Sequence, residues 1–172
     1  MILPLPVDAS ASRLEIQART LPKRSRAAQP SLAAVAALLL VFAAVWLVHL
    51  DWASLSPPTD NIEQLTWVHA IEWGYYKHPP LPTWLFWLGT QALGIEAWTS
   101  YVAGALCTLT SMVLMWTLLR HLRGSRWATV ALLGALCITY YNIRLYYYNH
   151  ETVLMVFVAA SAWACWQAHA TG

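Results

Sequence analysis

The sequence predicts an all-α protein built from several membrane-spanning helices, and three observations support this fold class. Of the 172 residues, 59% are apolar and only 10% are charged, against about 25% charged in an ordinary soluble domain. The apolar residues form uninterrupted runs of membrane-spanning length, and the charged residues gather between these runs. Such a chain cannot cover itself with polar surface, so we expect an integral membrane protein.

The first predicted span covers residues 31–50. It carries no formal charge, and at 1.5 Å per residue it would be about 30 Å long, the thickness of a hydrocarbon core. A cleaved signal peptide would have a shorter apolar region of about 7–15 residues and a small-residue cleavage site. Because Asp51-Trp52 follows the run instead, we expect a retained anchor. Residues 1–29 before it are predicted to be a disordered, basic cytoplasmic tail, and residues 30–172 a single membrane domain.

Three further spans are predicted over residues 99–119, 127–143 and 152–168. The first of these has 21 residues without a charge, whereas the other two have 17 each, the short end of the spanning range. The polypeptide between the first and second spans, residues 51–98, is too long to be a simple turn. It is therefore predicted to be a structured outer loop.

This outer loop is predicted to contain two short helices next to the membrane. Asp60 lies where a helix N-cap belongs, and Glu63 follows at the capping-box spacing, which predicts a helix over residues 61–72. Residues 80–94 are apolar but too short to span, and they open with prolines that suit a helix start. We therefore interpret this second segment as a buried or interfacial helix.

The basic residues are distributed unevenly and predict the orientation. Eight of the ten lie either in residues 1–29 or in the short loop 120–126, while the other loops hold most of the acidic residues and only Lys77 and Arg144 as cations. The positive-inside rule then places the N-terminus in the cytoplasm and the outer loop outside. The predicted location is the plasma (inner) membrane, with membrane lipids as partners. Since the basic tail serves as a topology signal, no nucleic acid partner is expected.

Polar residues that could carry chemistry occur first in the outer loop. The carboxylates of Asp60 and Glu63 have a structural interpretation as a helix cap and a functional one as a base at the mouth of a membrane cavity. Residues 74–80 form a predicted turn that carries Lys77 and His78. These basic side chains would suit an anionic phosphate at the membrane surface.

A second polar cluster opens the last span. Tyr146, Tyr147 and Tyr148 are interpreted as members of an interfacial aromatic belt. They are accompanied by polar residues on the same predicted side as Asp60, where such groups are least expected: Arg144, Asn149, His150 and Glu151. His150, Glu151 and Glu63 are also ligand types for a divalent cation, which stays an open alternative. Their spacing matches no metal motif, so no metal site is assigned.

Several motifs resemble those of one enzyme family. The outer loop is similar to the first outer loop of glycosyltransferase family 39, relatives of the bacterial aminoarabinose transferase and the protein O-mannosyltransferases. After the acidic residues Asp60 and Glu63, the matching positions are Trp73-Gly74-Tyr75, Pro79-Pro80-Leu81 and Trp84-Leu85. The stretch YYYNHETVLMVF also resembles the family's next outer motif. One departure is Asn61, since the family's acidic pair is often Asp-Glu.

The resemblance implies a GT-C-like fold, of which this chain matches the N-terminal portion. It also implies an inverting transfer of a sugar from a polyprenyl-phosphate donor to a lipid, glycan or protein acceptor at the outer face. Asp60 would be the catalytic base and Glu63 the second catalytic carboxylate. The candidate substrate contacts are Tyr75, Lys77, His78, Arg144, Asn149, His150 and Glu151.

Because enzymes of this family are much longer, we expect a truncated form or a fragment. Two other functions stay open on the sequence. One is a non-catalytic membrane accessory subunit, and the other is a small transporter or assembly factor for lipid carriers.

Overall fold

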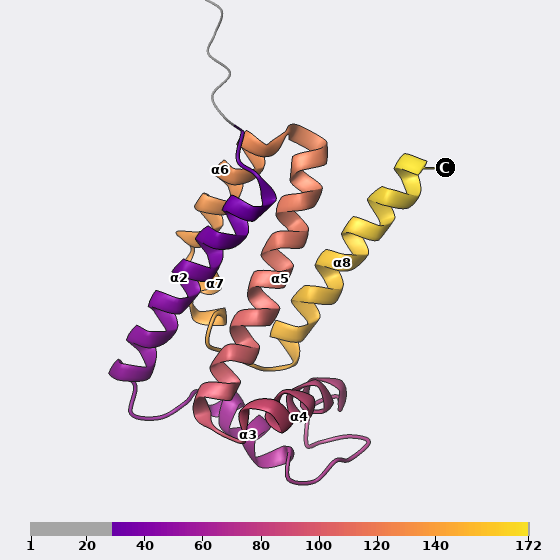
Figure 1. Ribbon diagram of the computed structural model, residues 1–172. Coiled ribbons are helices and arrows are strands. Elements are labelled where there is room, and N and C mark those ends of the chain that lie inside the picture. The colour runs from indigo at the N-terminus through magenta and orange to yellow at the C-terminus, as the bar shows by residue number, and fades with distance from the viewer. Residues whose placement is uncertain (1–28, 172) are drawn as a thin grey trace, which may run out of the picture.

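A computed structural model describes residues 29–171 of the chain, and every regular element in this range is a helix (Figure 1). Three helices are long and apolar enough to cross a membrane: α2 (Leu32–Ala53), α5 (Ala97–Arg123) and α8 (His150–Thr171). They coincide with three of the four predicted spans, each extended by several residues. The all-α membrane fold is therefore confirmed. The predicted tail lies outside the described residues, apart from residue 29.

Helix α5 is the centre of the molecule and contacts each of the other described helices. Its N-terminal half buries mainly small and hydroxyl-bearing side chains, which allow neighbouring backbones to approach closely. Within α2, the buried side chains recur every four residues and form the stripe that faces α5. These small and hydroxyl-bearing residues are Thr99, Ser100, Gly104, Ala105, Thr108 and Ser111, and the larger Tyr101 and Leu109 are buried among them.

The chain returns from α5 to α8 through a broken helix. Residues 127–143 were predicted to form one continuous span, but helix α6 (Ser125–Leu136) ends before α7 (Thr139–Arg144) begins. This prediction of a continuous helix is wrong. The chain turns after α6, where the N–H groups of Cys137 and Ile138 bond to the carbonyls of Gly134 and Ala135. Side chains from other helices then bind the end of α7. The Trp46 indole donates to the carbonyl of Asn142 (2.9 Å), and the Thr108 hydroxyl donates to the carbonyl of Arg144 (2.9 Å). Irregular backbone in a membrane protein needs such partners.

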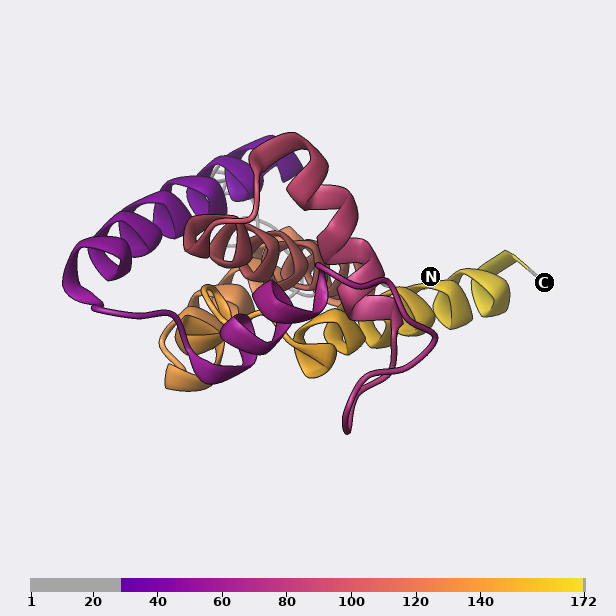
Figure 2. The same cartoon turned by 90° about the horizontal axis from the view of Figure 1, so that it is seen from below.

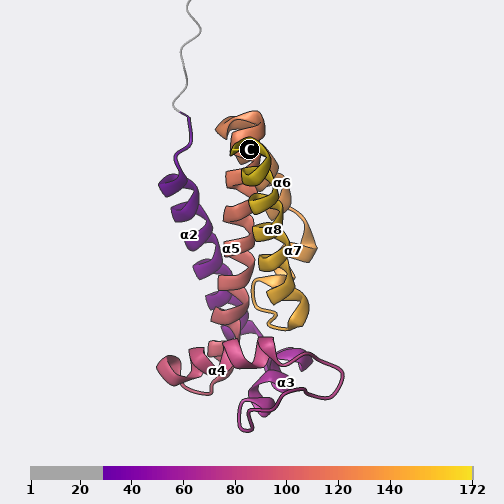
Figure 3. The same cartoon turned by 90° about the vertical axis from the view of Figure 1, so that its right-hand side faces the viewer.

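Two short helices, α3 (Thr59–Trp67) and α4 (Leu81–Leu93), form a layer across one end of the long helices (Figures 2 and 3). The predicted second helix is confirmed as α4. Helix α3 is shorter than predicted, because the N–H groups of His69 and Ala70 bond three residues back, to the carbonyls of Thr66 and Trp67, and end the α-helical pattern. Side chains from farther along then bind the carbonyls of the segment that follows. The Tyr75 hydroxyl donates to the carbonyl of Ala70, and the Trp84 indole donates to that of Glu72.

Helix α4 presents its apolar residues in two directions. Phe86 packs in a buried cluster with Tyr148, and Thr83 and Thr90 are buried beside it. The face that carries Leu85 and Leu88 is exposed. The second small helix thus attaches to the bundle through one side and leaves an apolar side uncovered.

Candidate active site

Buried hydrogen bonds bring the two predicted polar clusters together at the end of the bundle that carries α3 and α4. Asn61 on α3 is fully buried. Its amide donates to the Ser100 hydroxyl and to the carbonyl of Tyr146 (both 2.8 Å), and its side-chain oxygen accepts from the backbone N–H of Tyr148 (2.9 Å). One side chain therefore ties α3 to α5 and to the segment that precedes α8. An amide supplies both a donor and an acceptor, which a carboxylate at this position would not.

A second pair of contacts fixes α4 to the same place. The Tyr148 hydroxyl donates to the carbonyl of Pro82 (2.7 Å), and the Thr83 hydroxyl donates to the side-chain oxygen of Gln64 (2.9 Å). Tyr148 is buried, and burial raises the pKa of its phenol well above the ordinary value. The prediction that Tyr148 belongs to an interfacial aromatic belt is therefore wrong, because its side chain is packed inside the protein. Its phenol is a structural hydrogen-bond donor.

Asp60 lies in the first turn of α3, and the prediction that it is the N-cap is wrong. The cap position is Pro58, and no side chain caps this helix start. The Asp60 carboxylate instead accepts a hydrogen bond of 2.7 Å from the amide of Asn149. Among the described residues, it forms no ion pair. Asp60 is half-buried.

Asn149 is the connection between Asp60 and the start of α8. It directly precedes α8, and its side-chain oxygen accepts from the backbone N–H of Thr152 (2.9 Å), the contact that an N-cap makes. The same oxygen accepts from the Arg144 guanidinium (3.2 Å). Since Asn149 is buried and both ends of its amide are occupied, it holds other side chains in position.

The guanidinium of Arg144 lies at the edge of the site. It forms an ion pair with Glu151, whose side chain is half exposed. It also lies over the rings of Tyr140 (4.9 Å) and Tyr147 (5.5 Å), an arrangement that stabilises a cation. Burial, together with the nearby negative charge of Asp60, raises the pKa of the Tyr147 phenol, so this phenol is neutral at physiological pH.

The remaining predicted residues surround Glu63. Its carboxylate accepts from the Lys77 ammonium at 2.9 Å and lies 3.5 Å from the ring of His78. The hydrogen bond and charge of Glu63 raise the pKa of Lys77, which therefore stays cationic at neutral pH. The rings of His78 and His150 are 4.3 Å apart. This cluster keeps unused hydrogen-bonding capacity, since three buried atoms have no hydrogen-bond partner: Glu63 Oε2, His78 Nδ1 and His150 Nδ1.

A tight turn presents Lys77 to this cluster. Tyr75 and His78 pair through two backbone hydrogen bonds, and Lys77 between them has a φ of 59°, a left-handed conformation that is uncommon for a residue with a side chain. Tyr75 supports the turn rather than the cluster. Its ring stacks on Trp67, and its hydroxyl bonds to the backbone at Ala70 and Glu72. The turn is therefore built at the expense of local strain.

The structure thus unites Asp60, Glu63, Lys77, His78 and the residues from Arg144 to Glu151, and leaves Tyr75 in a supporting place. Sequence reasoning missed three buried residues that hold the site together: Gln64, Thr152 and the bridging role of Asn61. The spacing of Asn149 and Thr152 is a helix-cap signal that could have been recognised. Within residues 29–171, no group of three or more His, Cys, Asp or Glu side chains is arranged to hold a metal ion.

Comparison with known proteins gives one match. The family model for dolichyl-phosphate-mannose-protein mannosyltransferases matches residues 77–172, which is more than half of the chain. The matched region begins at Lys77 and includes α4, the four helices that follow it and the polar segment before α8, whereas α3 and Asp60 lie outside it. No curated protein and no solved structure matches the chain.

Proposed function

Because the chain belongs to the dolichyl-phosphate-mannose-protein mannosyltransferase family, we propose that it transfers a sugar from a polyprenyl-phosphate donor to a hydroxyl-bearing acceptor. The acceptor is a lipid, a glycan or a protein at the outer membrane surface. One observation carries the proposal. The Asp60 carboxylate is held by Asn149 and has no cationic partner among the described residues, while the Arg144 guanidinium also binds Asn149 and the Lys77 ammonium pairs with Glu63 on the same helix as Asp60.

This arrangement suits an inverting displacement. The acceptor oxygen attacks the anomeric carbon, the bond between that carbon and the phosphate oxygen breaks, and the polyprenyl phosphate leaves with the bonding electron pair. Asp60 takes the proton of the acceptor hydroxyl as a general base. Lys77 and Arg144 stabilise the negative charge of the departing phosphate. Glu63 holds Lys77 in place, and the unpartnered nitrogens of His78 and His150 supply polar contacts for the sugar.

The proposed site faces the outside of the plasma membrane. Figure 1 shows the start of α2 and the connection between α5 and α6 at the end of the bundle opposite α3 and α4. That connection carries Arg120, Arg123 and Arg126, so the positive-inside rule supports a cytoplasmic N-terminus. A membrane-impermeant thiol reagent applied to intact cells should label a cysteine introduced at exposed Ser56 and miss one at exposed Arg126, in a background without native cysteines. The reverse pattern would contradict this orientation.

The exposed apolar surface favours a site that is completed by further helices. In the apolar 18-residue stretch of α8, only 11% of the residues are buried inside the protein, against 39% in the corresponding stretch of α5. An open side would admit lipid and water, whereas electrostatic stabilisation depends on a preorganised, enclosed site. The same observation favours a second candidate function, a membrane subunit that contributes this site to a larger assembly. Either function predicts that the purified 172-residue chain alone is inactive.

A donor experiment tests the proposed function. Membranes that contain the chain are given a radiolabelled sugar, either as a polyprenyl-phosphate sugar or as the corresponding nucleotide sugar under conditions that block lipid-carrier charging. Transfer above that of membranes without the chain is expected only from the lipid-linked donor. Equal transfer from the nucleotide sugar would contradict the proposal. An accessory subunit would instead raise transfer only when its catalytic partner is present.

A further inference from the structure

The Arg144 guanidinium is largely buried, yet its polar contacts do little to compensate its charge. Only 13% of the side chain is exposed, and a charge removed from water is costly unless partners compensate it. Its carboxylate partner, Glu151, has a side chain that is 51% exposed, and ion pairs open to solvent contribute little. The hydrogen bond to Asn149 is 3.2 Å long, at the upper end of the ordinary range. Other groups must therefore help to stabilise this cation.

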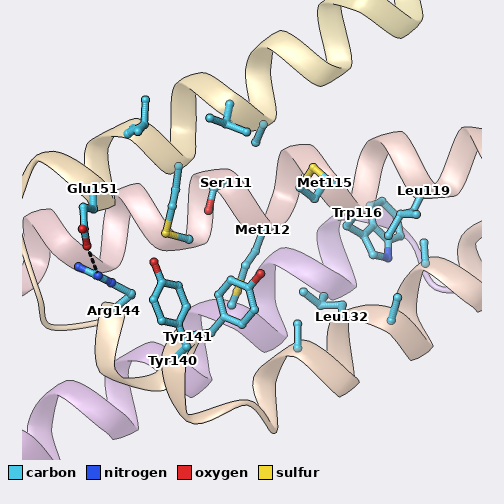
Figure 4. A pocket seen from close by; sticks show the side chains of 17 residues that line it. Ser111, Met112, Met115, Trp116, Leu119, Leu132, Tyr140, Tyr141, Arg144 and Glu151 are labelled. Carbon is cyan, nitrogen blue, oxygen red and sulfur yellow. Dashed lines mark hydrogen bonds and ion pairs between the residues drawn. The ribbon is translucent and has the colours of Figure 1, made fainter.

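Two tyrosine rings supply this stabilisation. The guanidinium carbon lies 4.9 Å from the centre of the Tyr140 ring and 5.5 Å from that of the Tyr147 ring, within the distance of about 6 Å over which a ring face attracts a cation. Tyr140 and Arg144 are four positions apart on α7, and side chains at this spacing lie on one face of a helix. Figure 4 shows both residues on α7 beside the open groove between α5, α6 and α8, with Glu151 joined to Arg144.

The backbone that carries these rings is held in place by α5 and α8. The carbonyl of Tyr147 accepts from the Thr152 hydroxyl (2.9 Å) and packs so closely on Gly104 that a Cβ atom there would lie 2.8 Å from the carbonyl oxygen. Tyr140 is 46% exposed and does not belong to the buried core. Packing in the core therefore does not account for the position of its ring, whereas the nearby cation does.

We propose that Tyr140 and Tyr147 are positioning residues, whose rings hold the Arg144 guanidinium in place for the phosphate of the lipid-linked donor. The inference rests on the proposed function and names the groups that keep this cation in position. A guanidinium carries its N–H donors in one plane. An aromatic ring stabilises the charge through its π face and needs none of these donors. A second carboxylate would instead compete with the phosphate for the same N–H groups, so rings are the partners that suit a cation with an anionic ligand.

A series of fluorinated phenylalanines tests the proposal. Each added fluorine weakens the negative potential of the ring face with little change in ring size, so the attraction for a cation falls stepwise. Phenylalanine and its mono-, di- and trifluoro derivatives replace Tyr140 or Tyr147 in the full chain, and transfer from a polyprenyl-phosphate sugar is measured in membranes. Phenylalanine should keep kcat/KM for the donor, whereas the trifluoro derivative should lower it by about threefold to tenfold, with the KM for the acceptor unchanged. Tyr140→Leu, which has no ring, should be at least as impaired.

Tyr141 is the matched control for this series. It follows Tyr140 on α7, and no cation of the described residues lies over its ring. The same substitutions at Tyr141 should leave kcat/KM for the donor constant. Steps at only one of the two proposed positions would overturn the role of the other ring. A constant kcat/KM at both Tyr140 and Tyr147, or equal steps at Tyr141, would overturn the whole proposal.

A spectroscopic measurement separates this proposal from the proposed function, because it needs no sugar transfer. The fluorine NMR signal of para-fluorophenylalanine at position 140 of the purified full chain should shift when Arg144→Gln removes the cation, and the same label at position 141 should shift much less. An unmoved signal at position 140 would overturn the proposal. A shifted signal without transfer from the lipid-linked donor would contradict only the proposed function. Normal transfer with a constant kcat/KM across the fluorine series would contradict only the positioning role.

Discussion

The amide of Asn149 donates a 2.7 Å hydrogen bond to the carboxylate of Asp60, although the two residues are 89 positions apart in the sequence. Asn149 simultaneously accepts from the first turn of α8 through Thr152. The orientation of the proposed base is therefore coupled to the start of a membrane-spanning helix. Since both ends of the buried amide are occupied, we assign Asn149 a positioning role in place of the substrate contact that the sequence predicted.

The Asn149→Asp substitution tests this coupling. Aspartate is as good an N-cap as asparagine, so the start of α8 should be kept. Aspartate at this position would remove the hydrogen bond that Asn149 donates to Asp60 and would place a like charge beside it, so kcat/KM should fall. Asn149→Ser is the control, because it retains a cap without adding charge and should lose less activity. An Asn149→Asp protein as active as the unmodified one would contradict the coupling.

Gly104 is the point where α5 touches the segment before α8 most closely. A Cβ atom there would lie 2.8 Å from the carbonyl oxygen and 3.0 Å from the carbonyl carbon of Tyr147, so this backbone would have to move. Gly104→Ala should lower stability by about 1–3 kcal/mol and reduce transfer, as measured by thermal unfolding in detergent and by the donor assay.

Gly89→Ala is the matched control for that substitution. Gly89 lies in α4, and a methyl group added there would have no neighbouring atom within 4 Å. Alanine is also a better helix former than glycine by about 1 kcal/mol. Stability should therefore be equal or higher, with unchanged transfer. If both substitutions behaved alike, the close approach at Tyr147 would not be what holds the segment in place.

Substitutions of Lys77 distinguish its effect on backbone strain from its effect on donor binding. Its φ of 59° disfavours any residue with a Cβ, so Lys77→Gly should leave the midpoint of thermal unfolding equal or slightly higher. The same change removes a proposed phosphate contact, and the KM for the lipid-linked donor should rise by about tenfold or more. Lys77→Arg, which keeps the charge and the strain, should bind donor much better than Lys77→Gly. If both variants had the donor KM of the unmodified protein, Lys77 would not be a contact of the donor phosphate.

The long helices were predictable from sequence because the membrane imposes its own length on them. Of the predicted spans, 99–119 and 152–168 lie wholly within a helix, and 31–50 does so apart from Ser31, the N-cap of α2. The break between α6 and α7 was not predictable, because residues 127–143 carry no charge on either side of it. The side chains that bind the end of α7, Trp46 and Thr108, come from distant helices. A hydropathy pattern reports burial in lipid but carries no information about such side-chain partners.

The residues of the site could be predicted from the sequence, but the contacts between them could not. The sequence placed Asp60 and the residues from Arg144 to Glu151 on one side of the membrane, and the structure joins them. Local spacing assigned Asp60 to a helix cap, because the capping-box pattern is visible within four residues whereas Asn149 is not. Asn61 was recognised only as a departure from a family pattern. Its bridging role depends on Ser100, Tyr146 and Tyr148, which only the folded chain brings within reach.

The most direct test of the proposed function is the rate of sugar transfer by Asp60→Asn in the membrane preparation that supports the unmodified protein. Asparagine can still accept the hydrogen bond from Asn149, so expression and thermal stability should be unchanged. Loss of a general base typically lowers the rate by about 10²–10⁴-fold, and we expect a loss in that range. Asp51→Asn, an exposed carboxylate at the outer end of α2, should transfer at the rate of the unmodified protein. Transfer by Asp60→Asn at a rate near that of Asp51→Asn would show that Asp60 is not the base and would contradict the proposed mechanism.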